Sequence, residues 1–525
     1  MASKLMLMAV IVPYLIIHTH HAYAYASLAL SRPVSPRIVS SFGHVNEEAM
    51  DSRMPRPRHI VIIGGGIIGT TTAYYLTRHP SFNPLIHHIT LVEATTSIAA
   101  GASGKAGGLL GLWAYPMCLV PLSYRLHAEL AAEHDGATRW GYRLLECGQI
   151  AATVKGKGKD SKSKAKSRAK RSTSSKAKRA NHREDMQLSQ QEQQENIPPE
   201  QRNSSPALPP EAQNVRQEHL KHEGKDWQKL PKQDEAAATL MHQSILPEDL
   251  DWIDSELVEE YAEMGLVGYT ETAQVHPYQF TTSMANLANS AGVEIRLNAK
   301  VTKIGLSRGS VKTVEYIDRI TESPRTMLGV TDVVVAAGPW TSSLLPQTKV
   351  EGLRAHSVIF EADVTPYAVF TNISLPANWM PPHRQRRVHN GQVDPEIYAR
   401  PGREVYACGE CDPSVPLPET ADLVEVDEAQ CDDMVAYIGT VSTILKAAPV
   451  TAKQACYMPR HMRPGQESTP IVGGTAVEGL WVAAGHTCWG IQNGPATGKL
   501  MSEFIFEGAA RSADIAELDP RQFGI

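Results

Sequence analysis

The sequence predicts an α/β protein in which a parallel sheet with helices on its faces is interleaved with a smaller α+β domain. A branched-aliphatic run at residues 59–63 leads through consecutive glycines into a segment with helical spacing. Further short apolar runs occur far along the chain, at residues 89–92, 333–335 and 480–484. Runs of this length and composition are typical of buried parallel strands. Because they are widely separated, the sheet must be assembled from several parts of the chain.

The composition is that of a soluble globular protein. The 525 residues are 42% hydrophobic and 20% charged, with a mean hydropathy of -0.26. These values exclude a wholly disordered chain, a collagen-like fibre and a polytopic membrane protein. The formal net charge of -5 argues against nucleic acid as a partner of the folded core. Seven cysteines do not indicate a disulfide framework, which favours a cytoplasmic, reducing compartment.

The N-terminal segment offers an alternative location. Within residues 1–26, a lysine precedes a 13-residue apolar run, which is followed by small residues at Ala22, Ala24 and Ala26. This is the layout of a secretory signal peptide, and the run is shorter than the ~20 residues that span a bilayer. A start of translation at Met50 or Met54 is equally compatible with the sequence. Residues 1–54 are therefore interpreted as a leader, and the cytoplasm and the secretory pathway both stay open.

Residues 151–245 differ in composition from the rest of the chain. The segment 151–180 carries 12 Lys or Arg and one Asp, and a stretch rich in Gln, Ser and Pro follows. Too few aromatic and branched side chains are present to offset the chain entropy, which predicts a disordered insertion. Its basic part is a candidate nuclear-import signal or contact for an anionic surface. A solvated insertion without function is the alternative.

The first glycine-rich segment predicts a dinucleotide site. Its spacing is G-x-G-x-x-G between a strand and a helix. Gly64 permits the tight turn, Gly66 lets a pyrophosphate approach the backbone, and Gly69 lets helix and strand pack closely. The phosphates would then meet the positive end of the helix, where the predicted contacts also include Gly65, Ile67 and Ile68.

Glu93 stands at the end of the second predicted strand, with Ala94 beside it. A carboxylate at this point accepts hydrogen bonds from an adenosine ribose 2′-hydroxyl and repels a 2′-phosphate. The dinucleotide is therefore expected to be NAD or FAD. An exposed glutamate that simply ends a strand is the alternative.

A second glycine-rich stretch at residues 100–110 favours FAD over NAD. An NAD-binding unit has no need of such a stretch after the acidic residue, whereas FAD extends further along the backbone. Small residues with accessible N–H groups suit its second phosphate and its ring. The predicted contacts in this stretch are Ser103, Gly104, Gly107, Gly108 and Leu109.

These segments, together with VVVAAGPW at residues 333–340 and GLWVAAGHTCWGIQNGPATG at residues 479–498, resemble the D-amino-acid-oxidase-type family of FAD-dependent oxidoreductases. That family includes glycine oxidase and sarcosine oxidase, and the resemblance covers residues 59–150 and 246–520. It implies a Rossmann-type FAD-binding domain, with further FAD contacts at Val301, Ala337, Gly338, Trp340, Gly485, Gly490 and Ile491. A helix is predicted over residues 496–506 with Pro495 as its first residue. The resemblance implies that the N-terminus of this helix faces the flavin ring, where it would favour negative charge.

The resemblance also implies how the domains alternate. The FAD-binding domain is expected to comprise residues 55–150, 331–350 and 456–525. The substrate domain is expected to comprise residues 246–330, which include the adenine-contacting strand at Val301, and residues 351–455.

The activity implied by the family is oxidation of a C–N bond. A hydride passes from an amine or amino acid to FAD, and dioxygen or another acceptor then takes the electrons. No metal is expected. Glycine-oxidase-like members hold the substrate carboxylate with an Arg that precedes a Pro, but here Met458 precedes Pro459. Arg354, Arg460 or Arg463 could take over that role, but surface base rates favour an ordinary surface arginine for each of them.

Three further side chains are candidates for the reaction centre. His486 follows the last predicted strand, where it is either a flavin or substrate contact or a structural histidine. Cys456 is near the position at which sarcosine-oxidase-like relatives bind flavin covalently, and a small buried core cysteine is the alternative. The pair Cys408 and Cys411 has redox-like or zinc-like spacing but lacks the surrounding pattern of either site.

Two other function classes stay open at this level. A flavoprotein with little turnover and a trafficking or scaffold role is compatible with the absent Arg and the long insertion. An NAD-dependent dehydrogenase is compatible with the first glycine-rich segment alone. A bound yellow chromophore would exclude the dehydrogenase.

Overall fold

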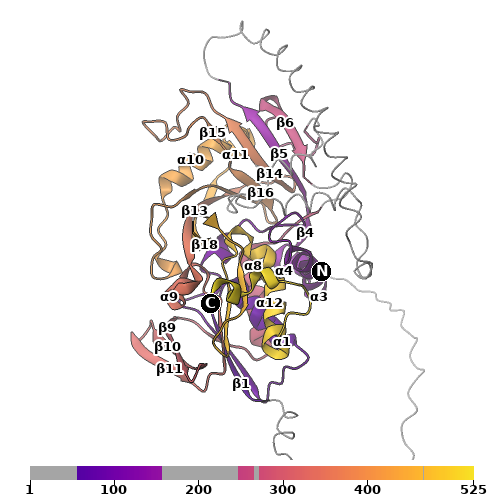
Figure 1. Ribbon diagram of the computed structural model, residues 1–525. Coiled ribbons are helices and arrows are strands. Elements are labelled where there is room, and N and C mark those ends of the chain that lie inside the picture. Colours follow the sequence, from indigo (N-terminus) through magenta and orange to yellow (C-terminus); the bar gives the residue numbers. More distant parts are fainter. Residues whose placement is uncertain (1–55, 156–245, 265–270, 465) are drawn as a thin grey trace, which may run out of the picture. The chain divides into compact units, whose positions relative to one another are not determined.

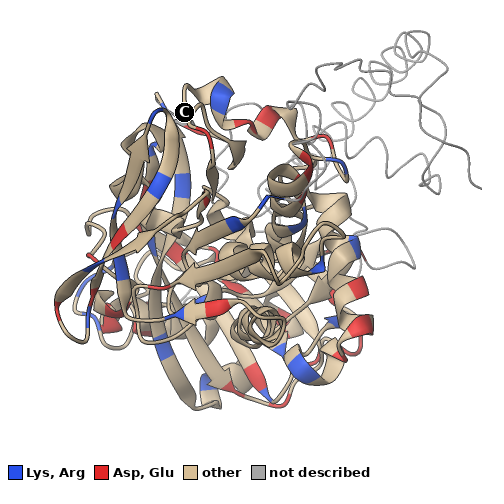
Figure 2. Ribbon diagram, turned by 90° about the horizontal axis from the view of Figure 1, so that it is seen from below, with Lys and Arg blue, Asp and Glu red and all other residues tan. Residues whose placement is uncertain are grey.

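The computed structural model describes residues 56–155, 246–264, 271–464 and 466–525. The predicted leader and nearly all of the predicted insertion lie outside these residues. Among the helices that are described, none is both long and apolar enough to cross a membrane. Lys and Arg are interspersed with Asp and Glu over the described part (Figure 2).

The predicted parallel sheet is present and has six strands. The order is β20 (Ile471–Gly474), β21 (Leu480–Ala484), β12 (Asp332–Val335), β1 (Arg58–Ile63), β2 (His87–Val92) and β8 (Glu294–Arg296). All neighbours are parallel except β20, which runs antiparallel to β21. The chain places β2 on one side of β1 and β12 on the other. This reversal of strand order opens a crevice at the carboxyl ends of the strands, where α/β proteins bind ligands.

Alternate residues of β1 enter different cores, as expected for a strand that is buried on both faces. Ile60 and Ile62 belong to the core formed with the helices, whereas Val61 and Ile63 belong to the opposite core. The helical core contains α1 (Ile67–Arg78), α3 (Val120–Glu133), α8 (Pro277–Ser290) and α12 (Gly490–Glu507). The opposite core contains the antiparallel sheet β9 (Ala299–Ser307), β10 (Ser310–Asp318) and β11 (Ser323–Leu328) (Figure 1).

A nine-stranded sheet forms most of the second domain. Its order is β19 (Gln466–Glu467), β18 (Val450–Arg463), β13 (Val350–Glu361), β17 (Glu404–Asp412), β16 (Glu396–Arg400), β14 (Tyr367–Ser374), β5 (Glu146–Thr153) and β6 (Val258–Glu263), with β15 (Gln392–Val393) beside β14. Two helices, α10 (Glu428–Ile438) and α11 (Thr443–Ala447), contribute to its core. A smaller sheet contains β3 (Leu109–Gly111), β7 (Thr272–Gln274) and β4 (Arg143–Leu144).

The structure changes the predicted domain assignment of residues 246–330. They were expected in the substrate domain, but β8 pairs with β2 in the parallel sheet and α8 packs in the helical core. Strand pairing also moves two predicted boundaries. The insertion was expected to begin at residue 151, but β5 pairs with β14 through Thr153. β5 therefore belongs to the nine-stranded sheet and not to the FAD-binding part. The expected boundary between residues 455 and 456 falls inside β18, which pairs along its length with β13. Both boundaries depend on partners more than 90 residues away, which local composition does not reveal.

The last long helix also begins earlier than predicted. α12 starts at Gly490, so that Pro495 lies inside the helix and is not its first residue. Pro495 has no N–H to offer to the carbonyl of Ile491, four residues before it. His127 of α3 compensates, because its Nε2 lies 3.0 Å from that carbonyl oxygen. Ser123 of the same helix donates to the next carbonyl at 2.6 Å.

Candidate active site

A cavity of about 610 Å³ extends from the carboxyl ends of the parallel strands to the nine-stranded sheet. Its walls include the ends of β1, β2, β12 and β21 on one side and residues of β16, β17 and β18 on the other. The volume is within the range of small-molecule and cofactor sites. The crevice predicted from the strand order is therefore one part of a cavity shared by both domains.

The three motif glycines have different roles. Gly64 has a φ of 118°, and a Cβ there would lie 2.3 Å from the carbonyl oxygen of Ala336. A Cβ on Gly69 would lie 2.0 Å from the carbonyl oxygen of Gly64. Both positions thus serve close backbone packing. Gly66 lines the cavity, and its Cβ would meet only the side chain of Ser103, at 3.0 Å from Oγ.

Gly65 positions Glu93 and does not itself line the cavity. Its N–H donates to Glu93 Oε2 at 2.7 Å, while Glu93 Oε1 accepts from the N–H and the hydroxyl of Thr95, each at 2.9 Å. The carboxylate is therefore fixed where Glu93 forms part of the cavity wall. This is the geometry that recognition of a ribose hydroxyl requires.

The N-terminus of α1 opens on the same cavity. No acidic residue stands in its first turn, so the positive end of the helix is not neutralised by its own side chains. The N–H of Ile67 donates to Ser103 Oγ at 2.9 Å, which ties the helix to the second glycine-rich stretch. Gly66 and Ile68 line the cavity beside this end, which suits an anionic group such as a phosphate.

Val301 lies where the resemblance places an adenine contact. It belongs to β9, the outer strand of its three-stranded sheet, and it lines the cavity. An outer strand leaves half of its backbone N–H and C=O groups available to a ligand. Next to it, Lys300 also lines the cavity and pairs with Glu419 at 3.0 Å.

Most of the predicted cofactor contacts come together in this cavity. Those that line it are Gly64, Gly66, Ile67, Ile68, Glu93, Ala94, Ser103, Gly107, Gly108, Leu109, Val301, Ala337, Gly338, Trp340, Cys456, Gly485, Gly490 and Ile491. Gly65, Gly69 and Gly104 are not among the lining residues and instead support the backbone around it. A Cβ on Gly104 would lie 2.1 Å from the carbonyl oxygen of Ala99. At these three positions the structure differs from the prediction, because the glycines permit close packing around the cavity and do not line it.

The opposite end of the cavity is aromatic. Tyr398 and Tyr406 stack with their ring centroids 5.8 Å apart, and both are buried. A Cβ on Gly107 would lie 2.4 Å from the ring of Tyr398, so the second glycine-rich stretch lies directly against this pair. Trp489 lines the cavity from the segment before α12 and meets the edge of Trp113.

Glu396 is the acidic residue of this aromatic end. Its Oε2 accepts from the hydroxyl of Tyr398 and from Cys408 Sγ, the latter at 3.6 Å. Burial, reinforced by the nearby Glu396 carboxylate, raises the pKa of Tyr398, so the phenol stays protonated and donates. Sequence reasoning missed both residues. Their spacing of two places them on one face of a strand, but nothing local indicates that this face lines a cavity.

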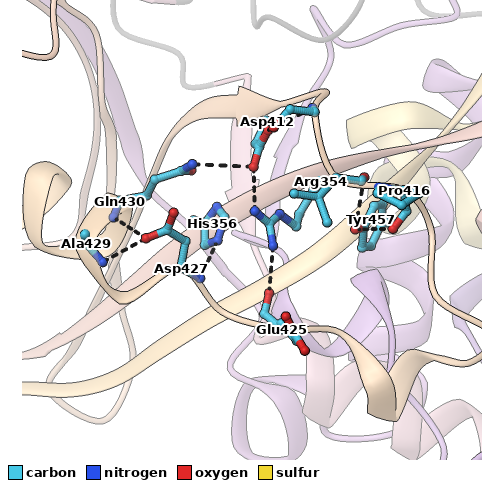
Figure 3. A network of polar contacts seen from close by, with 11 residues as sticks. Arg354, His356, Asp412, Pro416, Glu425, Asp427, Ala429, Gln430 and Tyr457 are labelled. Atoms are coloured by element: carbon cyan, nitrogen blue, oxygen red, sulfur yellow. Dashed lines mark hydrogen bonds and ion pairs between the residues drawn. The ribbon is translucent and has the colours of Figure 1, made fainter.

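Arg354 is not a substrate anchor. It and Asp412 are directly opposed on β13 and β17, both are buried, and their side chains pair at 2.5 Å (Figure 3). A second guanidinium nitrogen donates to the carbonyl of Glu425 at 3.2 Å. Hydrogen bonds from Ser414 and from Arg354 hold the pKa of Asp412 well below its usual range. Arg354 is not among the residues that line the cavity.

His486 does line the cavity, as predicted, and it is neutral. Its Nε2 lies 3.0 Å from the hydroxyl oxygen of Thr497, on α12. Burial lowers the pKa of His486 to about 3, so the ring carries no charge at neutral pH. Its part in the reaction stays a prediction.

Cys456 also lines the cavity and stands near Lys105. Burial raises the pKa of the Cys456 thiol to about 11, against the opposing effect of the Lys105 charge. Lys105 ends the short helix α2 (Ala102–Lys105) and donates to the carbonyl of Ala455 at 2.9 Å. Beside Cys456, Met458 presents a thioether to the cavity where the resemblance would place an arginine.

Cys408 and Cys411 both line the cavity, on the same strand, β17. Within the described ranges, no three His, Cys, Asp or Glu side chains are grouped to hold a metal ion. The pair thus contributes to the wall of the aromatic end.

The profile of the family described as FAD dependent oxidoreductase (DAO) matches residues 59–504. The chain belongs to this family. It is 36% identical over 516 residues to the Saccharomyces cerevisiae protein named "Putative oxidoreductase TDA3", covering 89% of this chain and 95% of that one. The Schizosaccharomyces pombe protein named "Putative oxidoreductase C1F5.03c" is 30% identical over 493 residues, covering 89% of this chain and 99% of that one.

Solved structures share the fold. Glycine oxidase from Geobacillus kaustophilus superposes with a TM-score of 0.57 at 16% identity, covering 88% of this chain and 98% of that one. L-proline dehydrogenase from P. horikoshii superposes with a TM-score of 0.55 at 15% identity, covering 90% and 99%. The family is FAD-dependent, and the residues present suit FAD. The first turn of α1 contains no acidic residue, Glu93 is fixed by hydrogen bonds, and any side chain added at Gly66 would narrow the cavity.

Proposed function

We propose that this FAD-dependent oxidoreductase oxidises a C–N bond of an amine or amino acid. The observation that carries the proposal is the continuous cavity, in which a dinucleotide-type wall passes without a break into a buried aromatic pocket that contains a carboxylate. Glycine oxidase, L-proline dehydrogenase and iminodiacetate oxidase, which share the fold, are named for substrates with such bonds.

The chain's own residues suit this reaction. Bound FAD supplies the hydride acceptor. The N-terminus of α12, with Gly490 and Ile491 in the wall, and the Lys105 ammonium both place positive potential on the cavity between the two domains. Tyr398 and Tyr406 exclude water from the pocket beyond, since their stacked rings are buried. His486 contributes a neutral imidazole to the cavity wall and therefore adds no charge there.

An anaerobic reduction screen tests the proposal. The purified holoprotein is mixed with a panel of primary amines, secondary amines and amino acids, and the visible absorbance of the bound FAD is followed. We expect bleaching by at least one compound and recovery of the colour with dioxygen or an artificial acceptor. An oxidised spectrum that persists with every compound would overturn the proposal and favour a flavoprotein with little turnover.

A further inference from the structure

We propose that residues 415–425 of the second domain form a clasp over the adenosine end of the FAD site, and that this clasp must open before FAD can enter or leave. The clasp joins β17 to α10. It would control cofactor exchange, which is independent of the substrate that the enzyme oxidises. Three observations support it: its place in the cavity wall, its contacts with the dinucleotide-binding domain, and the anchoring of both its ends.

The middle of the clasp is part of the cavity wall. The five consecutive residues that line the cavity are Leu417, Pro418, Glu419, Thr420 and Ala421. Thr420 and Ala421 are buried, although they lie in a connection between a strand and a helix. Connections usually run over the surface, so a buried one has packed against another part of the molecule.

An ion pair joins the clasp to the strand predicted to contact adenine. Glu419 pairs with Lys300 of β9 at 3.0 Å, and Lys300 is next to Val301. The Glu419 side chain is 76% exposed, so the pair is accessible to solvent and is weakened by salt. The clasp is thus held to β9 by a contact that opens easily.

A second ion pair joins the clasp to the segment predicted to bind the ribose. Asp422 pairs with Arg319 at 2.9 Å, and Arg319 also donates to the carbonyl of Ala94 at 2.9 Å. Ala94 directly follows Glu93, whose carboxylate is fixed by Gly65 and Thr95. One arginine therefore holds the clasp and the ribose-binding segment together.

Neutral contacts close the clasp against the second glycine-rich stretch. The indole N–H of Trp340 donates to the carbonyl of Pro418 at 2.7 Å. A Cβ on Gly101 would lie 3.8 Å from the Cβ of Ala421. Both Trp340 and Gly101 line the cavity. The clasp therefore contacts the dinucleotide-binding domain on three sides of the adenosine end.

Both ends of the clasp are anchored in the second domain (Figure 3). The hydroxyl of Tyr457 donates to the carbonyl of Pro416 at 2.9 Å. Arg354 pairs with Asp412, shortly before the clasp, and donates to the carbonyl of Glu425 at its far end. The side chains that anchor the ends are buried, whereas the ion pairs of the middle are partly exposed and individually weak. The middle is therefore the part that can lift away.

A closed clasp would enclose the adenosine part of FAD, as loops in other enzymes enclose their ligands. FAD could then leave only while the clasp is open. Opening separates two solvent-accessible ion pairs, so the rate of FAD release should rise with ionic strength.

A reversible disulfide in the full-length holoprotein tests the proposal. In Gly101→Cys/Ala421→Cys the two Cβ atoms would lie 3.8 Å apart, within the range of disulfides. The φ of Gly101 is -88°, which a cysteine adopts without strain. The double variant is oxidised with glutathione disulfide and diluted, and release of FAD is followed by the increase in FAD fluorescence. We expect release at least tenfold slower than from the reduced form, and recovery of the original rate with a phosphine reductant.

A second pair of variants tests the charges. Glu419→Gln/Asp422→Asn removes both ion pairs and keeps the size of the side chains, and it should release FAD at least threefold faster at low salt. Glu361→Gln/Glu410→Gln is the matched control, because it removes two exposed carboxylates of the same domain that lie outside the cavity wall. About 0.5 M NaCl should accelerate release from the wild type and the control, and change the clasp variant less.

Each result decides for or against the clasp. A disulfide that is confirmed by mass but leaves the release rate unchanged would overturn the proposal. Failure of the disulfide to form would also overturn it, because the two segments would then not be adjacent. Equal acceleration in the clasp and control variants would reject the role of the two ion pairs. Slow release from the oxidised protein, in an enzyme whose flavin no amine reduces, would keep the clasp and reject the proposed function instead.

Discussion

The two ends of the cavity are built from different material. The dinucleotide end is made of backbone and small residues, such as Gly64, Gly66 and Ser103, which follow one another closely along the chain. The aromatic end is made of large side chains, such as Glu396, Tyr406 and Trp489, from strands and turns far apart in the sequence. Recognition of a dinucleotide needs close backbone approach, whereas recognition of a substrate needs particular side chains at particular points.

The two domains also satisfy their buried polar groups differently. In the dinucleotide-binding domain, the neutral His127 and the Ser123 hydroxyl contact the carbonyls of Ile491 and Gln492 in the turn before Pro495. In the nine-stranded sheet, the buried guanidinium of Arg354 is matched by the carboxylate of Asp412 (Figure 3). The contacts in the dinucleotide-binding domain are sensitive to protonation of the His127 imidazole. The ion pair in the second domain is sensitive to loss of either charge. Targeted substitutions separate these two behaviours.

The largest effect is expected from Gly66→Val. The added side chain would occupy the space between Gly66 and Ser103, where the cavity is bounded by the N-terminus of α1. We expect a folded protein from which the copurifying FAD is lost, measured by visible absorbance relative to protein. Glu93→Ala should weaken FAD binding only about tenfold, since it removes hydrogen bonds worth roughly 1 kcal/mol each. Retention of the wild-type FAD content by Gly66→Val would reject the site.

Asp412→Asn should leave FAD in place and destabilise the second domain. It leaves the buried Arg354 without its carboxylate, and breaking a buried pair in this way costs about 3–5 kcal/mol. Asp422→Asn is the matched control, because its pair with Arg319 is partly exposed and worth about 0–1 kcal/mol. Unfolding by urea measures both. If Arg354 bound the substrate instead, Asp412→Asn would change substrate affinity with little loss of stability.

On acidification, the contacts of His127 in the dinucleotide-binding domain should weaken at a higher pH than the pair of Arg354 and Asp412 in the second domain. Burial lowers the pKa of His127 to about 4, below the ordinary value of 6.5. The stability that the neutral ring provides is thus complete above pH 6.5 and falls as the pH drops towards 4, by about 3 kcal/mol from the difference in pKa. The pKa of Asp412 is lowered. The stability that its pair with Arg354 provides is therefore complete above the ordinary carboxyl pKa of about 4 and falls only below that pH.

Thermal unfolding of the holoprotein between pH 7 and pH 4.5 checks this. His127→Gln should be less stable at pH 7 yet lose less stability on acidification, because one of the buried imidazoles no longer titrates. His486, with a pKa lowered to about 3, accounts for part of the remaining slope. An acid dependence identical to that of the wild type would show that His127 is not the source.

The same contrast explains what the sequence could reveal. The parallel strands and the glycine turn were predictable because their signals are local: a branched-aliphatic run, then glycines at fixed spacing. The early start of α12 was not, because the contacts that permit Pro495 inside the helix come from α3. The sequence left Arg354 open as a substrate anchor, because only strand pairing brings its partner Asp412 opposite it. Glu396 was missed for the same reason.

The smallest effect is expected at Cys456, which lies where the two ends of the cavity meet. A covalent bond to the flavin requires a thiolate, and burial raises the pKa of this thiol to about 11 despite the charge of Lys105. The group is therefore almost wholly protonated at neutral pH. We expect acid precipitation to release all of the FAD into the supernatant, and Cys456→Ser to keep the wild-type FAD content and visible spectrum. Yellow colour that stays with the precipitated wild type and is released from Cys456→Ser would instead establish a covalent link. It would also mean that this cysteine, and not backbone alone, fixes the flavin at the boundary between the two kinds of wall.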